Sequence, residues 1–260
     1  MRPLDVKNSL SPYPIQTITL DRVEEWEFTC DHPQVMELSR VFREKAQLGA
    51  SFDQVLESIR RDPKAGSLIV GAAWLEFTEL VPWALCTLAG RVDNNLARHF
   101  VIQTAFEELG SRNRNAIHSD LFAQCIDQVG AGLSSTREWI ATHPVRALET
   151  LKQSVAQASC TTEVMGLCLG LELPANENIQ TLVEGIGTSE SLRDRLLKTP
   201  FFRIHRVVED EHIRLSISNY LHFCRTQKAR DQFTRSFDQG IRFWREYWGE
   251  VSQRIIRGSA

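Results

Sequence analysis

The chain has 260 residues, of which 42% are hydrophobic and 24% are charged, and its formal net charge is −3 at pH 7. This composition is typical of a folded protein with a sizeable core and excludes intrinsic disorder. The small negative charge gives no reason to expect nucleic acid as a partner. The N-terminus lacks the apolar run of a signal peptide, and no uninterrupted apolar run approaches the roughly 18 residues of a membrane span. We therefore expect a cytoplasmic protein without a membrane partner.

Six cysteines are scattered along the chain and form no C-x-x-C pair, which argues against a zinc ribbon or a thioredoxin-like motif. We expect reduced thiols in the core. The cysteines are Cys30, Cys86, Cys125, Cys160, Cys168 and Cys224.

Helical periodicity dominates the sequence, and strand patterns are scarce. Residues 1–33 contain four of the nine prolines and are interpreted as an irregular lead-in, followed by a helical domain over residues 34–260. Ser51 and Gln54 predict a capping box, Asp93 predicts a helix cap, and Pro82 predicts an interruption or a kink. The expected helices are 33–49, 51–61, 67–90, 93–109, 116–129, 134–159, 162–173, 175–186, 188–198, 200–225 and 230–257. No repeat or linker is present, so the sequence predicts a single all-α domain.

His205, Glu209 and His212 are spaced i, i+4 and i+7, which places them within about 60° of one another on one stripe of a helix. Two neutral imidazoles and one carboxylate form a ligand set that suits ferrous iron. The alternative is an amphipathic helix that carries its histidines by chance. Apolar neighbours such as Ile204 and Val208 indicate that the stripe faces inward, where unpartnered polar groups are costly.

Two further segments offer partners for this stripe. Glu108 ends one predicted helix and His118 lies near the start of the next, so a turn that contains Gly110 can bring both side chains to one metal ion. Glu172 lies between two leucines in an apolar helix, where an isolated carboxylate is costly unless it is paired or metal-bound.

The pattern Glu108-Leu-Gly…His118, then Glu172, then Phe201-Phe202-x-x-His205-x-x-x-Glu209-x-x-His212 resembles the ligand pattern of the haem-oxygenase-like di-iron oxidases and oxygenases. The resemblance covers roughly residues 73–248. It implies a haem-oxygenase-like helical bundle that holds two Fe(II)/Fe(III) ions, with dioxygen as co-substrate. The implied metal ligands and catalytic residues are Glu108, His118, Glu172, His205, Glu209 and His212.

In the division that the resemblance implies, Glu108, His118 and Glu172 serve one iron, and His205, Glu209 and His212 serve the other. Either Glu172 or Glu108 bridges the two ions. The family usually has Asp where this chain has Glu209, and Asp210 is the alternative ligand there. Glu107 is the alternative to Glu108. An extra carboxylate from the preceding helix would be Glu79 or Glu76.

The resemblance further implies oxidation of a small organic substrate. We expect an amino acid or a derivative of one, through N-oxygenation, desaturation or oxidative C–C cleavage, with Arg203, Arg206 or Arg214 as candidates to bind a substrate carboxylate. Fatty-acid decarboxylation is the alternative activity. An external electron donor and a homodimer are both compatible with this function.

Other classes remain as alternatives. A metal-free thiaminase-like hydrolase or quinone-cofactor synthase would share the fold but would not need all six ligands. A haem oxygenase needs an early histidine, and the first 98 residues contain only His32. A ferritin-like protein normally has two E-x-x-H motifs, whereas only Glu209-x-x-His212 fits here. A helical scaffold with chance histidines is the non-enzymatic alternative. The histidines interpreted as structural or surface residues are His32, His99, His143 and His222.

Overall fold

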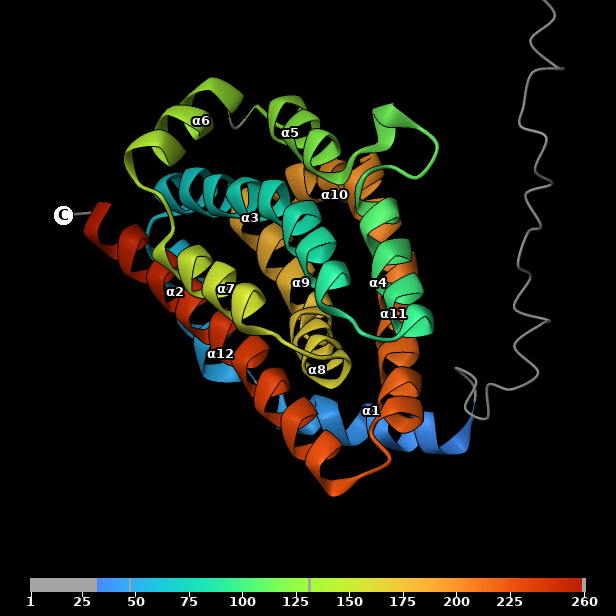
Figure 1. The fold of residues 1–260 in the computed structure, drawn as a ribbon. Helices are drawn as coiled ribbons and strands as arrows, with labels where there is room; N and C mark the ends of the chain where they lie inside the picture. The colour runs from blue at the N-terminus through green and yellow to red at the C-terminus, as the bar shows by residue number, and fades with distance from the viewer. Residues whose placement is uncertain (1–31, 47, 131, 259–260) are drawn as a thin grey trace, which may run out of the picture.

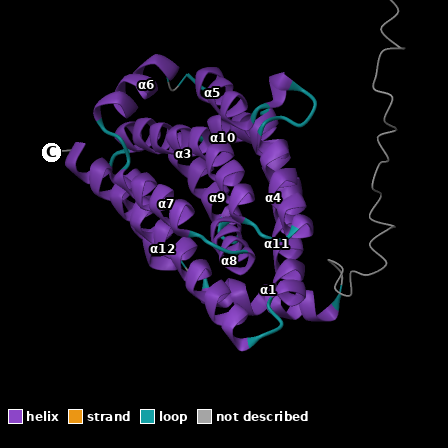
Figure 2. Ribbon diagram, in the orientation of Figure 1, coloured by secondary structure: helices purple, strands orange, loops and turns teal. Residues whose placement is uncertain are grey.

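The computed structural model describes residues 32–46, 48–130 and 132–258. Within these ranges every regular element is a helix and no strand is present (Figure 2), which confirms the predicted all-α class. The predicted lead-in over residues 1–33 falls almost wholly outside the described residues, as does Cys30, so those expectations stay predictions.

The long helices enclose a central pair. In Figure 1, α8 and α9 lie in the middle of the view, with α3, α4, α11 and α12 around them. Helix α12 packs along α8, and α3 packs against α4 and α9. The helices are α1 (Pro33–Lys45), α2 (Gly49–Arg61), α3 (Pro63–Arg91), α4 (Asn95–Glu108), α5 (His118–Gln128), α6 (Leu133–Thr142), α7 (Arg146–Gln157), α8 (Thr161–Glu172), α9 (Ala175–Ile186), α10 (Glu190–Lys198), α11 (Pro200–Phe223) and α12 (Gln227–Gly258), with a short 3-10 helix, η3 (Arg114–Ala116), before α5.

Most predicted helices are present with ends shifted by a few residues, but two predicted caps are wrong. Helix α2 begins at Gly49 rather than Ser51 and has no side-chain cap. Helix α4 is capped by Asn94, whose side chain accepts hydrogen bonds from the backbone N–H groups of Leu96 and Ala97. The carboxylate of Asp93 instead accepts a hydrogen bond from the Thr161 hydroxyl at the start of α8. Asp93 thus bonds to a side chain that is distant in sequence instead of capping the helix that follows it.

One predicted helix is two helices. The expected helix over residues 134–159 is divided into α6 and α7, and the break falls at His143. Its backbone is non-helical, with φ −137° and ψ 61°, because the ring of the following Pro144 disfavours the helical conformation for the residue before it. By contrast, α3 runs through Pro82 without an interruption, and the predicted alternative of a kink agrees with the bend of α3 in Figure 1.

Helix α3 is long and apolar enough to cross a membrane when judged by length and composition alone. Its most apolar window is 61% buried within the structure. Core helices of many proteins pass the same test, so this is weak evidence for a membrane span.

Helices α8 and α12 approach each other closely at glycines. A Cβ atom on Gly170 would collide with the carbonyl oxygen of Phe237 and would lie 3.1 Å from the Cα atom of Gly240. Only residues without side chains allow this separation of the two backbones. The contact matters for function because it sets the position of Glu172 at the end of α8.

We expect Gly170→Ala to lower the free energy of unfolding by about 1–3 kcal/mol, because the new methyl group meets backbone atoms that cannot rotate away. Urea denaturation measures this effect. Gly249→Ala in α12 is the matched control, since nothing lies within 4 Å of the added Cβ and the loss of a helical glycine stabilises by up to about 1 kcal/mol. Equal stability of Gly170→Ala and the unmodified chain would show that α8 and α12 are not this closely packed.

Aromatic rings fix the other side of the same region. The indole of Trp74 from α3 stacks on Trp244 and Trp248 from α12, with centroid distances of 5.7 and 6.0 Å. The Nε1 atom of Trp244 donates a hydrogen bond of 3.0 Å to the carbonyl oxygen of Leu171, the residue before Glu172. Helix α12 therefore holds the end of α8 through both its backbone and a side chain.

Candidate metal centre

The predicted site residues come from the ends of two helices, the start of a third and the interior of a fourth. Glu107 and Glu108 end α4, His118 begins α5, and Glu172 ends α8. His205 and His212 lie on α11. Most of these groups lie at helix ends, so the loops and crossings between the helices determine whether they meet.

The turn between α4 and α5 brings Glu108 and His118 together, as the sequence predicts. Gly110 has a φ of +81°, a backbone conformation that residues other than glycine rarely adopt. A Cβ atom on this residue would also lie 2.5 Å from the carbonyl oxygen of Asn113 and 2.7 Å from the carbonyl carbon of Ala116. The chain therefore folds back tightly, and Nδ1 of His118 lies 3.0 Å from Oε2 of Glu108.

His205 completes a three-residue group with this pair. One potential ligand atom from each of Glu108, His118 and His205 lies within 4.8 Å of the others. The imidazole rings of His118 and His205 are 4.8 Å apart between centroids. Among the described residues, this is the group whose nitrogen and oxygen atoms converge closely enough to share one metal ion.

The geometry at His118 fits a metal ligand better than a hydrogen-bond partner. Its Nδ1 atom is buried and has no aligned hydrogen-bond partner among the described residues, although Glu108 lies only 3.0 Å away. Buried polar atoms are almost always satisfied. A nitrogen and a carboxylate oxygen that lie side by side, and face a common point rather than each other, are arranged as two ligands of one ion.

His205 is oriented and kept neutral by its surroundings. Its Nδ1 atom donates a hydrogen bond of 2.8 Å to the carbonyl oxygen of Phe201, one turn earlier in α11. This bond leaves Nε2 as the atom with a free lone pair. Burial lowers the pKa of His205, and the neighbouring Glu108 carboxylate only partly offsets that effect. A neutral imidazole is the form that binds a metal ion.

The carboxyl group of Glu108 is held ionised although it is buried. Burial alone would raise its pKa, but the interaction with the adjacent His118 imidazole outweighs this effect, so the pKa of Glu108 lies below its usual value. An ionised carboxylate beside the neutral imidazole of His205 provides an anionic site that favours a cation.

A second group lies around His212. Its Nε2 atom is 2.9 Å from Oε2 of Glu107, and its Nδ1 atom is 3.5 Å from Oε2 of Glu172. The hydrogen bond from His212 lowers the pKa of Glu107, although partial burial opposes it. Both consecutive glutamates at the end of α4 therefore contact site histidines, where the sequence predicted one or the other.

The structure thus brings together five of the six predicted ligands, but in a different grouping. His205 lies with Glu108 and His118, whereas we expected it to share an iron with His212. The side chains of residues 206–211 lie outside the described part, so the roles of Glu209, Asp210 and Arg206 stay predictions. Glu79 pairs with Arg137 at 3.0 Å, and Glu76 accepts a hydrogen bond from the backbone N–H of Val145. Neither is brought to the site.

A largely apolar cavity of about 100 Å³ adjoins the first group. Glu108, Glu172 and His205 line one part of it, and aromatic and aliphatic side chains such as Trp74 and Phe77 line most of the remainder. No arginine or lysine is among its lining residues in the described chain. The sequence did not reveal this cavity, because its walls come from helices far apart in the chain.

Cys168 lies one turn before Glu172 in the wall of this cavity. Burial, and to a smaller extent the charge of Glu172, raises the pKa of Cys168 to about 12. Burial raises the pKa of Cys125 to about 11. The thiols described in the structure are free, and Cys125 and Cys224 are buried as predicted, but Cys86 is exposed and is not a core thiol.

At pH 8 we expect iodoacetamide to alkylate the exposed Cys86 well before Cys125 and Cys168, because only the thiolate reacts and burial suppresses it. Peptide mapping by mass spectrometry reads the order of labelling, and the urea-unfolded chain, in which every cysteine should react, is the control. Labelling of Cys168 at the rate of Cys86 would contradict its burial.

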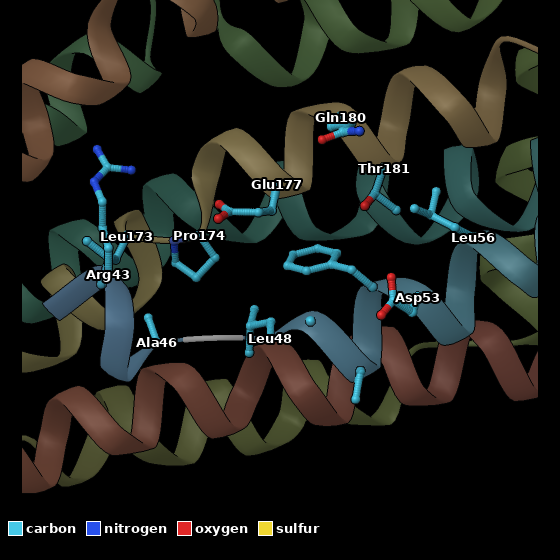
Figure 3. Close-up of a pocket in the computed structure, with 13 residues that line it drawn as sticks. Arg43, Ala46, Leu48, Asp53, Leu56, Leu173, Pro174, Glu177, Gln180 and Thr181 are labelled. Carbon is cyan, nitrogen blue, oxygen red and sulfur yellow. The ribbon is translucent and has the colours of Figure 1, made fainter. Parts of the chain in front are cut away.

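A larger hollow of about 480 Å³ lies between α1, α2 and α9 (Figure 3). Its labelled charged residues are Arg43, Asp53 and Glu177, and no histidine or cysteine lines it. It lacks the residues for metal or redox chemistry, so the smaller cavity beside Glu108 is the better candidate for a reaction site.

The fold and the site define the class of protein: an all-helical, haem-oxygenase-like bundle with an internal histidine and carboxylate cluster. A model of the iron-containing redox enzyme family matches residues 74–245, which is more than half of the chain. The chain belongs to this family of iron-containing redox enzymes.

Solved structures agree with the fold. Two crystal structures of a CADD-like protein of unknown function from Nostoc punctiforme PCC 73102 are similar to this chain, each with a TM-score of 0.65. The sequence identities are 15% and 18%, and the alignments cover 87% and 86% of this chain and 98% and 99% of theirs. At such identities the likeness concerns the fold alone. No curated protein matches the chain.

Proposed function

We propose that this protein is a non-haem di-iron enzyme that activates dioxygen to oxidise a small organic substrate. The observation that supports this most strongly is the convergence of Glu108, His118 and His205 within 4.8 Å, beside a second group formed by His212, Glu107 and Glu172. Family membership supports iron as the metal. Two adjacent groups that each contain imidazole and carboxylate side chains suit two ferrous ions.

When bound, the two iron ions would supply the electrons and the binding site for dioxygen. The chain provides the rest. Glu108, with Glu172 and the predicted ligand Glu209, would nearly balance the charge of two ferrous ions, and neutral histidines add no further charge. Phe201 holds His205 through its carbonyl oxygen, so Nε2 stays directed away from that bond. Buried walls keep bulk water from the reacting atoms.

The cavity beside the site supports an apolar substrate over the amino acid that we expected. A substrate carboxylate would need a cation, yet among the described side chains Arg203 is exposed on α11, and neither Arg203 nor Arg214 lines the cavity, while the side chain of Arg206 lies outside the described part. The polar side chain of Thr78 is already engaged, since its hydroxyl donates to the carbonyl oxygen of Leu75 at 2.9 Å. The volume of about 100 Å³ accommodates a short apolar segment rather than a long chain. We therefore place a substrate with an aliphatic chain before an amino acid: the chain would occupy the cavity, and a carboxylate at its end, as in an aliphatic acid, would lie outside the apolar walls.

Oxygen uptake tests this proposal. Protein loaded anaerobically with ferrous iron is mixed with aerated buffer, and an oxygen electrode follows consumption with aliphatic acids or amino acids of increasing length. We expect uptake to rise with aliphatic acids and to fall to the rate of free ferrous iron in His205→Ala. Equal uptake by the two proteins would contradict the proposal and favour a metal-free thiaminase-like or quinone-cofactor-synthase-like relative.

The proposal includes the cytoplasm as location and an external electron donor that returns the irons to the ferrous state. A homodimer is compatible with it, and sedimentation analysis measures that state directly.

A further inference from the structure

The two nitrogen atoms of His212 each face a carboxylate, and a histidine that binds a metal ion uses only one of them. Nε2 lies 2.9 Å from Glu107, and Nδ1 lies 3.5 Å from Glu172. The nitrogen that does not bind the metal commonly donates its proton to a carboxylate, which fixes the ring and raises its basicity. The positions of Glu107 and Glu172 decide which nitrogen has which role.

Glu172 lies on the inner side of His212. It lines the apolar cavity together with Glu108 and His205, and it lines a smaller adjoining cavity together with His212. It is therefore placed between the two groups of histidines, where a ligand shared by both ions would lie.

Glu107 lies on the outer side. It lines neither of these cavities, and its Oε1 atom accepts a hydrogen bond of 3.2 Å from Nε2 of Gln103, one turn earlier on the exposed face of α4. Its side chain is 34% exposed, whereas that of Glu172 is 19% exposed. Glu107 is thus anchored at the surface of the helix and reaches His212 from outside.

We propose that Glu107 is a positioning residue that accepts a hydrogen bond from the Nε2–H group of His212 and so directs Nδ1, rather than Nε2, toward the metal ion next to Glu172. This role rests on the proposed di-iron function, and it differs from the predicted use of Glu107 as a substitute ligand for Glu108. Gln103 holds the carboxylate in place, which makes Gln103, Glu107 and His212 one continuous chain of hydrogen bonds.

Titration with Co(II) under anaerobic conditions tests the proposal without any turnover. The visible absorption of bound Co(II) counts the equivalents, and competition with a chelator gives the affinity of each one. In Glu107→Ala we expect the affinity for one equivalent to fall by about 10–100-fold, with full occupancy at saturating Co(II) and the other equivalent unchanged. Glu107→Gln, which keeps an acceptor oxygen without the charge, should lose less.

Glu149→Gln is the matched control, because Glu149 is an exposed glutamate paired with Lys152 on α7. It should bind both equivalents normally. The proposal is overturned if Glu107→Ala leaves both affinities unchanged, if it weakens both equally as a structural defect would, or if it removes one equivalent even at saturation, as loss of a direct ligand would. If the unmodified chain binds two equivalents of Co(II) in any of these cases, only the role of Glu107 is rejected and the proposed di-iron function is retained. If the unmodified chain binds no Co(II), both the role of Glu107 and the di-iron function are rejected.

Discussion

His118→Ala is expected to lower the iron affinity of the first group by more than about 100-fold and to abolish substrate-dependent oxygen uptake. Loss of a residue that merely supports a ligand already costs about 10–100-fold, so loss of a ligand should cost more. The imidazole is buried beside Glu108 and His205, and no other described histidine can take its place. Chelator competition measures the affinity, and the oxygen electrode measures uptake.

His99→Ala is the matched control for this variant, because His99 is an exposed histidine on α4, the helix that carries Glu108. It should bind iron and consume oxygen as the unmodified chain does. Added imidazole should partly restore His118→Ala by filling the vacated space. Normal iron affinity in His118→Ala would mean that the convergence with Glu108 has no role in metal binding.

Gly110→Ala is expected to weaken iron binding although it removes no ligand. A residue with a side chain at a φ of +81° lowers the free energy of unfolding by roughly 1–2 kcal/mol. Here the added Cβ also collides with the backbone of Asn113 and Ala116. The turn must open, and that movement separates His118 from Glu108. We expect lower thermal stability together with at least about a 10-fold loss of iron affinity, since displaced ligands behave like unsupported ones.

Gly130→Ala separates the two effects. Gly130 has a φ of +77°, similar to that of Gly110, but nothing lies within 4 Å of its added Cβ. It should lose stability through backbone strain and keep its iron affinity. If Gly110→Ala bound iron as tightly as Gly130→Ala does, the turn would not be what positions the site.

The parts of the site that the sequence predicted are those fixed by local geometry. The spacing of His205 and His212 determines that both lie on one stripe of α11, and Gly110 marks a turn that returns the chain from Glu108 to His118. The division of the ligands between two groups was not predictable. Glu107 and Glu108 differ by about 100° around α4, and the rotation of that helix depends on how its buried face packs in the bundle.

The same distinction holds for the fold. Helix α9 has the predicted bounds, and the break before Pro144 follows from a rule of local sterics that the prediction of one long helix overlooked. Asp93 does not cap α4 because its carboxylate accepts a hydrogen bond from Thr161, which is distant in sequence. The close crossing of α8 and α12 at Gly170 requires knowledge of which two helices meet, and an isolated glycine in a helical pattern does not reveal that.

Iron analysis of the whole chain tests the central claim most directly. Protein is reconstituted anaerobically with ferrous iron, freed of excess metal by gel filtration, and analysed by inductively coupled plasma mass spectrometry together with quantitative amino-acid analysis. Two iron ions per chain are expected in the unmodified protein, because the histidines and carboxylates form two adjacent groups. An iron content below about half an equivalent per chain would contradict a structural basis for metal binding in these residues.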